Sequence, residues 1–97
     1  MEEYLAYFEW DDLKALINLD KHGILFEDAV LTFFDLDFLS GFDEKHSDLE
    51  IRYTGMGKHP SGAILVTIYT ERSDKFRIIS SRHANRRERM IYANNKD

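Results

Sequence analysis

The chain has 97 residues, of which 43% are apolar, 32% are charged and none is cysteine. Such a chain is expected to form one globular domain, because cores divide into several only in much longer chains. The composition excludes a disulfide framework and a thiolate metal site, and no apolar run approaches the ~20 residues that span a bilayer. The acidic start at residues 1–3 differs from a secretory signal, so a cytoplasmic location is expected.

The net charge of −5 hides an asymmetry between the two halves of the chain. Residues 1–50 hold 3 Lys/Arg and 14 Asp/Glu, a net charge of −11, whereas residues 51–97 hold 10 and 4, a net charge of +6. Segregation of this kind points to a polyanion-binding face. The alternative is that acidic helices pair with a basic sheet on the folded surface, and charge alone slightly favours that alternative.

The N-terminal part of the chain predicts a short strand at residues 7–10, followed by two helices. Asp11 is the expected N-cap of the first helix, which should stop at His22 with Gly23 in the left-handed position. The apolar positions Leu13, Leu16 and Ile17 fall on one face of this helix.

The second helix carries the strongest periodic signal in the sequence. Its apolar residues recur with helical spacing, at Phe26, Ala29, Val30, Phe33 and Phe34. We expect this stripe to pack on the β-branched, nearly continuous apolar strand predicted at residues 64–70.

The second half of the chain alternates between apolar and polar residues, which is typical of strands. Strands are predicted at residues 50–55, 64–70 and 76–81, with a further short strand compatible with residues 38–39. A last helix should begin with a capping box in which Asn85 and Glu88 exchange hydrogen bonds. The clear elements give the order β-α-α-β-β-β-α. This order predicts an α+β fold with an antiparallel meander and helices on one face.

Five arginines crowd residues 77–92 of this acidic protein. Arg86 and Arg87 would oppose the dipole of the last helix, and Arg82 and His83 lie just before its cap. A bound phosphate would make the cluster favourable, because helix starts attract anions. Pairing with the acidic helices is the alternative, and physical arguments leave the two nearly even. Strand alternation places Arg77 on the face opposite to Arg82 unless a bulge intervenes.

An ordered set of short segments resembles the BrnT toxin family over about residues 7–92. The matching segments are Phe8-Glu9-Trp10-Asp11, Lys14-Ala15 with Asn18, Lys21-His22-Gly23, Phe26-Glu27-Asp28-Ala29, Phe33-Phe34-Asp35, His46-Ser47 with Glu50 and Arg52, Gly55, Tyr69-Thr70-Glu71-Arg72, residues 77–82, Ala84, residues 86–89 and Tyr92. No single segment is decisive, but the ordered set is specific.

The resemblance implies a bacterial type II toxin with endoribonuclease activity and a RelE-like fold. It further implies an RNA substrate and a BrnA-like antitoxin of the ribbon-helix-helix class. Operator DNA would be bound only through the complex of toxin and antitoxin. No cofactor and no membrane partner are implied.

Metal-free RNA cleavage requires a deprotonated 2′-hydroxyl, a stabilised phosphorane and a protonated leaving oxygen. Arginine forks suit the phosphorane, whereas histidine or a perturbed carboxylate must move the protons. The catalytic candidates are Arg52, Arg77, Arg82, His46, Glu50 and His83, and the RNA-binding candidates are Arg82, Arg86, Arg87 and Arg89. His46 is nearer to a structural than a catalytic residue on this reasoning, and His22 and His59 are expected to be cap and turn residues.

A metal site is not expected, because the loop at residues 43–46 places Lys45 among its would-be ligands. The arginines Arg52, Arg77 and Arg82 are expected to converge, with the last helix start, on one phosphate-sized site. Arg82 should then be essential for growth arrest.

A non-catalytic binding module is the second functional hypothesis. In that case the basic half only docks an acidic antitoxin segment, and Arg-to-Glu changes at Arg86 and Arg87 would weaken the complex. Surface charge cannot separate the hypotheses, because RNA and an acidic peptide require the same surface.

Overall fold

The computed structural model describes residues 6–44 and 50–95, which hold three helices and five strands in the order β-α-α-β-β-β-β-α. The elements are β1 (Phe8–Glu9), α2 (Asp12–His22), α3 (Phe26–Thr32), β2 (Leu39–Phe42), β3 (Arg52–Lys58), β4 (Ile64–Arg72), β5 (Lys75–His83) and α4 (Arg86–Asn94). The predicted α+β class is confirmed, with one strand more than predicted because β2 pairs with β3.

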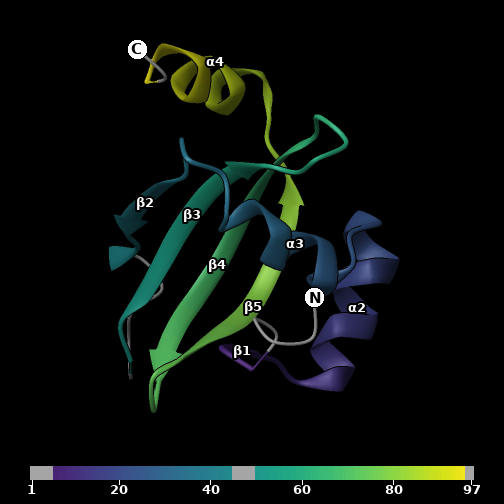
Figure 1. The fold of residues 1–97 in the computed structure, drawn as a ribbon. Helices are drawn as coiled ribbons and strands as arrows, with labels where there is room; N and C mark the ends of the chain where they lie inside the picture. The colour runs from purple at the N-terminus through teal and green to yellow at the C-terminus, as the bar shows by residue number, and fades with distance from the viewer. Residues whose placement is uncertain (1–5, 45–49, 96–97) are drawn as a thin grey trace.

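The five strands form one sheet in the order β1-β5-β4-β3-β2 (Figure 1). Strands β2 to β5 run antiparallel to their neighbours, which confirms the meander, whereas β1 lies parallel to β5. The parallel pair is short, joining Phe8 to Phe76 and Glu9 to Arg77. It brings the first described strand next to the last one, although almost seventy residues separate them in sequence.

Both ends of α2 follow from local chemistry, as predicted. The Asp11 carboxylate accepts a hydrogen bond from the Lys14 amide at 3.0 Å, which caps the first turn. Gly23 has a φ of 69° and donates its amide to Leu19 O at 2.8 Å, which closes the last turn. A side chain at Gly23 would be strained by this backbone conformation.

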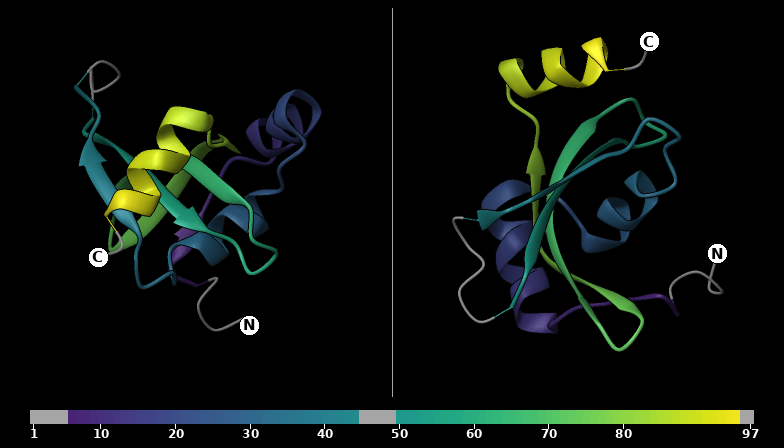
Figure 2. Two further views of the ribbon diagram at one scale, coloured as in Figure 1. Left: turned by 90° about the horizontal axis from the view of Figure 1, so that it is seen from above. Right: turned by 90° about the vertical axis from the view of Figure 1, so that its left-hand side faces the viewer.

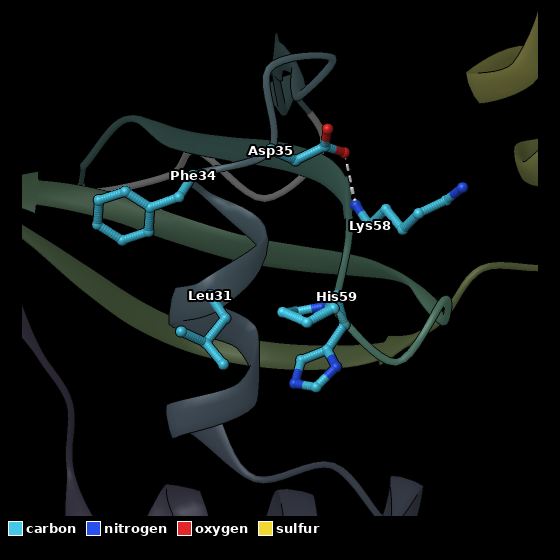
Figure 3. Close-up of a pocket in the computed structure, with 6 residues that line it drawn as sticks. Leu31, Phe34, Asp35, Lys58 and His59 are labelled. Atoms are coloured by element: carbon cyan, nitrogen blue, oxygen red, sulfur yellow. Dashed lines mark hydrogen bonds between the residues drawn. The ribbon is translucent and has the colours of Figure 1, made fainter. Parts of the chain in front are cut away.

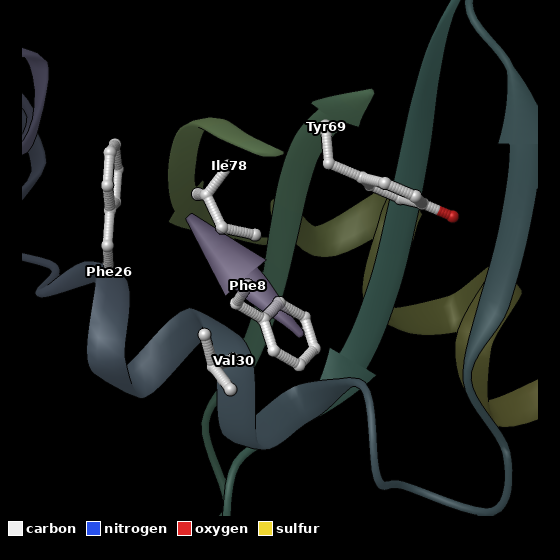
Figure 4. Packing of buried hydrophobic residues seen from close by; sticks show 5 residues of the cluster. All are labelled: Phe8, Phe26, Val30, Tyr69 and Ile78. Atoms are coloured by element: carbon white, nitrogen blue, oxygen red, sulfur yellow. The ribbon is translucent and has the colours of Figure 1, made fainter. Parts of the chain in front are cut away.

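The α3 helix covers one face of the sheet and forms the centre of the core (Figure 4). Phe26, Ala29 and Val30 are almost fully buried, as the periodicity predicted. The helix ends at Thr32, however, so Phe33 and Phe34 lie in the following turn rather than on the helix. Gly57 permits this end of α3 to approach β3 closely, because a Cβ there would lie 2.5 Å from the Thr32 carbonyl oxygen.

The expectation that all helices cover one face is wrong for α4, which follows β5 at the end of the sheet (Figure 2). Tyr92 of α4 is buried against Met56 and Val66, whose side chains point away from the α3 side. Its hydroxyl donates a hydrogen bond to the Asp35 carboxylate, and burial, then Asp35, raises the pKa of Tyr92. A second, smaller core therefore anchors α4.

The α2 helix lies along the edge of β5, where a buried side chain continues the sheet. Beyond Arg77, β5 has lost its β1 neighbour. The Asn18 amide group donates to Ser81 O at 2.9 Å and accepts from the Ser81 amide at 3.0 Å, as a paired strand would. Asn18 also donates to Ile24 O at 3.1 Å, so one side chain joins helix, loop and strand.

Replacing Asn18 by alanine should lower the free energy of unfolding by about 2 kcal/mol, because the buried backbone groups of Ser81 would lose their partners. Chemical denaturation followed by circular dichroism measures this change. Asp20 of the same helix is exposed, so Asp20→Ala is the control and should be nearly neutral. Equal stability of the two variants would contradict the edge-pairing role of Asn18.

Candidate functional site

Arg52, Thr70 and Arg77 form one row across three neighbouring strands. Arg52 of β3 pairs with Thr70 of β4, which pairs with Arg77 of β5, and Glu9 of β1 extends the row. Paired residues point to the same side of a sheet, so all four lie opposite to Tyr69, which faces the core. We call this side, carrying the row of Glu9, Arg77, Thr70 and Arg52, the arginine face.

The Arg77 guanidinium is held by the short parallel strand. Its Nη1 lies 2.8 Å from Glu9 Oε2, with 26% of the Arg77 side chain and 31% of the Glu9 side chain exposed. This ion pair is partly desolvated, so it orients the guanidinium more firmly than a fully exposed pair would. Strand β1 thus fixes one cation of the arginine face.

A second ion pair lies at the same end of the sheet. Arg72 is two residues beyond Thr70 on β4 and therefore shares its face. Its Nη2 and Nε donate to the two carboxylate oxygens of Glu50, at 2.8 and 3.0 Å. The hydrogen bond from Arg72 is the main cause that holds the pKa of Glu50 below its usual range, and the charges of Arg52 and Arg77 add to it.

These groups make one charged assembly, which we call the arginine–glutamate cluster: Glu9, Glu50, Arg52, Arg72 and Arg77. Three guanidinium groups are available to a phosphate, and two carboxylates lie beside them, of which Glu50 has the lowered pKa. The combination suits transfer of a proton from a hydroxyl next to a phosphodiester.

A bulge in β5 changes which arginines share a face. Tyr69 of β4 pairs with Ile78, and the next residue, Ile68, pairs with Ser80, so Ile79 is the extra residue. The bulge that the sequence analysis named as the exception to strand alternation is therefore present. As a result, the Arg82 side chain points to the arginine face. It pairs with Val66, four residues along β4 from Thr70, which corresponds to about 13 Å.

That separation contradicts the expected convergence of Arg52, Arg77 and Arg82 on a single phosphate-sized site. The first two belong to the arginine–glutamate cluster, whereas Arg82 lies where β5 leads into α4. Its guanidinium donates to both carboxylate oxygens of Glu88, at 2.8 and 2.9 Å. Arg82 thereby holds the pKa of Glu88 below its usual range, and Glu88 raises the pKa of Arg82.

The capping box of α4 is formed as predicted. The Glu88 amide donates to Asn85 Oδ1, and the Asn85 amide donates to Glu88 Oε1, each at 2.8 Å. The anion expected at this helix start is thus supplied in part by Glu88 itself. The remaining RNA-binding candidates lie beside it: Arg86 and Arg87 are exposed, and Arg89 donates to Ala84 O at 2.8 Å.

In the described part of the chain, His59 and His83 do not join the arginines. His83 pairs with Leu65 and so points to the α3 face, where it lines a pocket of about 200 Å³ with Asp28, His59 and Ser61. His59 binds Asp28 through Nε2 at 3.0 Å and Ser61 through Nδ1 at 2.9 Å, which ties the β3–β4 turn to α3. His46 lies outside the described residues.

Arg72, Glu9 and Thr70 belong to the site but were not among the predicted site residues. Arg72 could have been found from strand alternation. It lies two residues after Thr70 in the predicted strand and its continuation, so both side chains point to the same face. Glu9 could not have been found, because nothing in the sequence indicates that a two-residue strand pairs in parallel with a distant one.

A pocket of about 480 Å³ lies between the end of α3 and the β3–β4 turn (Figure 3). Leu31, Phe34 and Pro60 supply apolar walls, and Asp35 and His59 supply polar groups. Those polar groups have structural partners already, since Asp35 accepts the Lys58 amide at 2.7 Å and His59 binds Asp28. The pocket therefore offers one carboxylate and one imidazole, whereas the arginine–glutamate cluster gathers three guanidinium groups and two carboxylates.

Two comparisons identify relatives of this chain, while no curated protein matches its sequence. The family model for BrnT, the ribonuclease toxin of a type II toxin–antitoxin system, matches residues 10–88. The crystal structure of the Brucella abortus ribonuclease toxin BrnT is similar, with a TM-score of 0.64 and 28% identity. The match covers 81% of this chain and 96% of that one.

Sequence and fold therefore agree on a ribonuclease toxin of a type II toxin–antitoxin system. The chain belongs to the BrnT family. The matched residues include Glu50, Arg52, Arg72 and Arg77 of the cluster, whereas Glu9 lies one residue before them.

Across residues 6–44 and 50–95, no helix is long and apolar enough to cross a membrane. In the same part of the chain, no three His, Asp or Glu side chains are grouped closely enough to hold a metal ion.

Proposed function

We propose that this toxin is an endoribonuclease that cleaves RNA at the arginine–glutamate cluster without a metal ion, and thereby inhibits translation. The observation that carries the proposal is the cross-strand row of Arg52 and Arg77, which flanks Thr70 beside the Glu50 carboxylate. The family supports the ribonuclease class, and the two guanidinium groups of the row support the choice of this face for the reacting phosphate.

Each group of the cluster has a role that its chemistry supports. Arg52 and Arg77 donate to the phosphorane oxygens, where charge increases during the reaction. Glu50 is ionised at neutral pH, as an ordinary glutamate is, and Arg72 lowers its pKa further, so its carboxylate can accept the proton of the 2′-hydroxyl. The sequence does not decide which residue protonates the leaving oxygen: His46, a catalytic candidate that is nearer to a structural residue on that reasoning, lies outside the described residues.

The second cationic region extends the binding surface along the RNA. Arg82 lies about 13 Å from the row, further than one phosphate group spans, so it contacts a different phosphate. Arg86, Arg87 and Arg89 continue this surface on the first turns of α4. Such contacts position the strand without reading its sequence.

A type II system implies a protein antitoxin. We propose a BrnA-like ribbon-helix-helix protein, which carries the toxin to operator DNA while the toxin itself makes no operator contact. Both RNA and antitoxin are available in the cytoplasm, where we place the activity. The non-catalytic alternative keeps the antitoxin and removes the RNA cleavage.

Purified, antitoxin-free toxin should cleave total RNA in the presence of EDTA. Glu50→Gln should slow that cleavage by at least about 100-fold, which is the usual effect of losing a general base. Because the pKa of Glu50 is lowered, the wild-type rate should persist as the pH falls to 4.5, the ordinary glutamate value, and decline below it.

The melting temperature of Glu50→Gln controls for loss of its ion pair with Arg72. Absence of cleavage by folded wild-type toxin under all conditions would support the binding module. Cleavage that EDTA abolishes would contradict the metal-free mechanism.

A further inference from the structure

The α2 helix turns a mixed side with the buried Asn18 towards the protein and its large apolar side chains towards solvent. Ala15, Asn18 and His22 face the sheet, and Asn18 is buried. The apolar stripe predicted from the sequence lies on the opposite side of the helix, with 64%, 64% and 55% of each residue exposed, at Leu13, Leu16 and Ile17. We call these three residues the α2 stripe.

This orientation is fixed by the hydrogen bonds of Asn18. Its amide group binds the amide and carbonyl of Ser81 and the carbonyl of Ile24. Rotating the helix to bury the α2 stripe would break all three bonds and leave β5 unpaired at this edge, which is costly for buried polar groups. The stripe is therefore exposed in the stable fold, and contiguous apolar surface of this kind marks an interaction site.

Cations border the α2 stripe on one side, while the exposed Asp12 flanks the other side and the exposed Asp20 lies beside Leu16 and Ile17. Lys14 and Lys21 line a groove of about 160 Å³ between α2 and the bulge of β5, where Ile17 and Ile79 form the apolar floor. Residues 1–50 contain only 3 Lys/Arg, and two of them lie on this groove. The local positive edge is an exception within the acidic half of the chain.

We propose that the α2 stripe is the docking surface for the antitoxin. The occupant is an amphipathic segment of that protein, with apolar residues on the stripe and carboxylates along the edge formed by Lys14 and Lys21. The inference rests on the antitoxin partnership of the proposed function but not on its catalytic mechanism. It locates docking on α2 instead of the basic half that the sequence suggested.

The chemistry of the surface argues against two other occupants. RNA binds through phosphate contacts and base stacking, whereas Leu13, Leu16 and Ile17 offer neither charge nor aromatic rings. A second copy of this chain, paired antiparallel about a two-fold axis, would set Lys14 and Lys21 against the same lysines. An amphipathic partner whose carboxylates follow the edge of Lys14 and Lys21, and whose apolar residues cover the stripe without placing an acid against Asp20, satisfies both features.

The stripe shares no residue with the arginine–glutamate cluster, so antitoxin binding and RNA cleavage can be measured separately. The probe is the antitoxin encoded next to the toxin gene, titrated calorimetrically into the full-length toxin. Leu16→Glu and Ile17→Glu should each weaken binding by at least about 100-fold, as expected for central contacts of an interface. Their RNA cleavage and melting temperature should stay at wild-type values, because the substituted side chains are exposed.

Leu36→Glu is the matched control, since Leu36 is fully exposed and lies outside the stripe. It should bind the antitoxin like wild type. Lys14→Glu combined with Lys21→Glu should weaken binding most at low salt.

Three results would overturn the proposal. The first is wild-type affinity in Leu16→Glu together with weakened binding in Arg86→Glu/Arg87→Glu, which would place docking on the basic half. The second is a toxin that dimerises alone and becomes monomeric in Leu16→Glu, which would make a second copy the occupant. The third is a wild-type toxin that does not bind the antitoxin. Loss of antitoxin binding in Leu16→Glu supports docking on the α2 stripe even if the wild-type toxin cleaves no RNA. Failure of the docking proposal can therefore be distinguished from failure of the proposed cleavage.

Discussion

Replacing Arg77 by alanine is expected to slow RNA cleavage by about 100- to 1,000-fold, the usual effect of removing one donor to a developing charge. Arg77 is one of the two cations of the row; Thr70 separates it from Arg52, and Glu9 binds its guanidinium from the other side. Single-turnover cleavage of a defined RNA oligonucleotide measures the effect.

Arg77→Lys is the matched comparison, because it keeps the charge and loses the planar fork. It should recover only a small part of the rate. Thermal melting shows whether the loss of the Glu9 ion pair has altered the fold. A folded Arg77→Ala protein that cleaves RNA at the wild-type rate would remove the row from the mechanism.

Replacing Phe33 by alanine is expected to destabilise the protein by about 3 kcal/mol, at the lower end for phenylalanine truncation because the side chain is only partly buried. Its ring stacks on Phe38 with centroids 4.7 Å apart and meets Tyr69 edge-on at 4.9 Å. It also contacts Phe8 at 5.1 Å, so truncation opens a cavity where α3, the sheet and β1 meet.

Phe34→Ala provides the control from the next residue, since Phe34 is 54% exposed. Urea denaturation of both variants should show a clearly smaller loss for Phe34→Ala. Equal losses would mean that Phe33 is not the central aromatic of this core.

Features that depend on a few neighbouring residues could be predicted from the sequence. The Asp11 cap, the left-handed Gly23 and the capping box of Asn85 with Glu88 each require groups at most four residues apart. The buried part of α3 also followed from periodicity, because one helix face must meet the core.

Features set by distant contacts were mispredicted or missed. Alternation gives the face of a strand residue only until a bulge shifts it, so the position of Arg82 depended on Ile79. The outward rotation of α2 is decided by Asn18 bonding to Ser81, across 63 residues of sequence. The position of helix α4 is set by Tyr92, which packs against Met56 and Val66 on the face opposite to α3.

The candidate site divides in the same way. The predicted residues Glu50, Arg52 and Arg77 do come together, since they lie on neighbouring strands whose register is simple. His83 was proposed from its closeness to Arg82 in sequence, but adjacent strand residues point to opposite faces.

Arg72, Arg77 and Arg82 each hold a carboxylate at 2.8 Å, and this pairing has a kinetic consequence. The charges of these guanidinium groups are largely neutralised by their glutamate partners, and the whole chain has a pI near 5.3. The long-range attraction between this part of the surface and a polyanion is therefore weak. We therefore expect the arginine–glutamate cluster to capture RNA from dilute solution with little electrostatic steering, at a rate near the roughly 10⁵–10⁶ M⁻¹ s⁻¹ of neutral encounters. On this argument the toxin acts best on RNA that is already concentrated beside it, where phosphates can exchange with glutamates at contact distance.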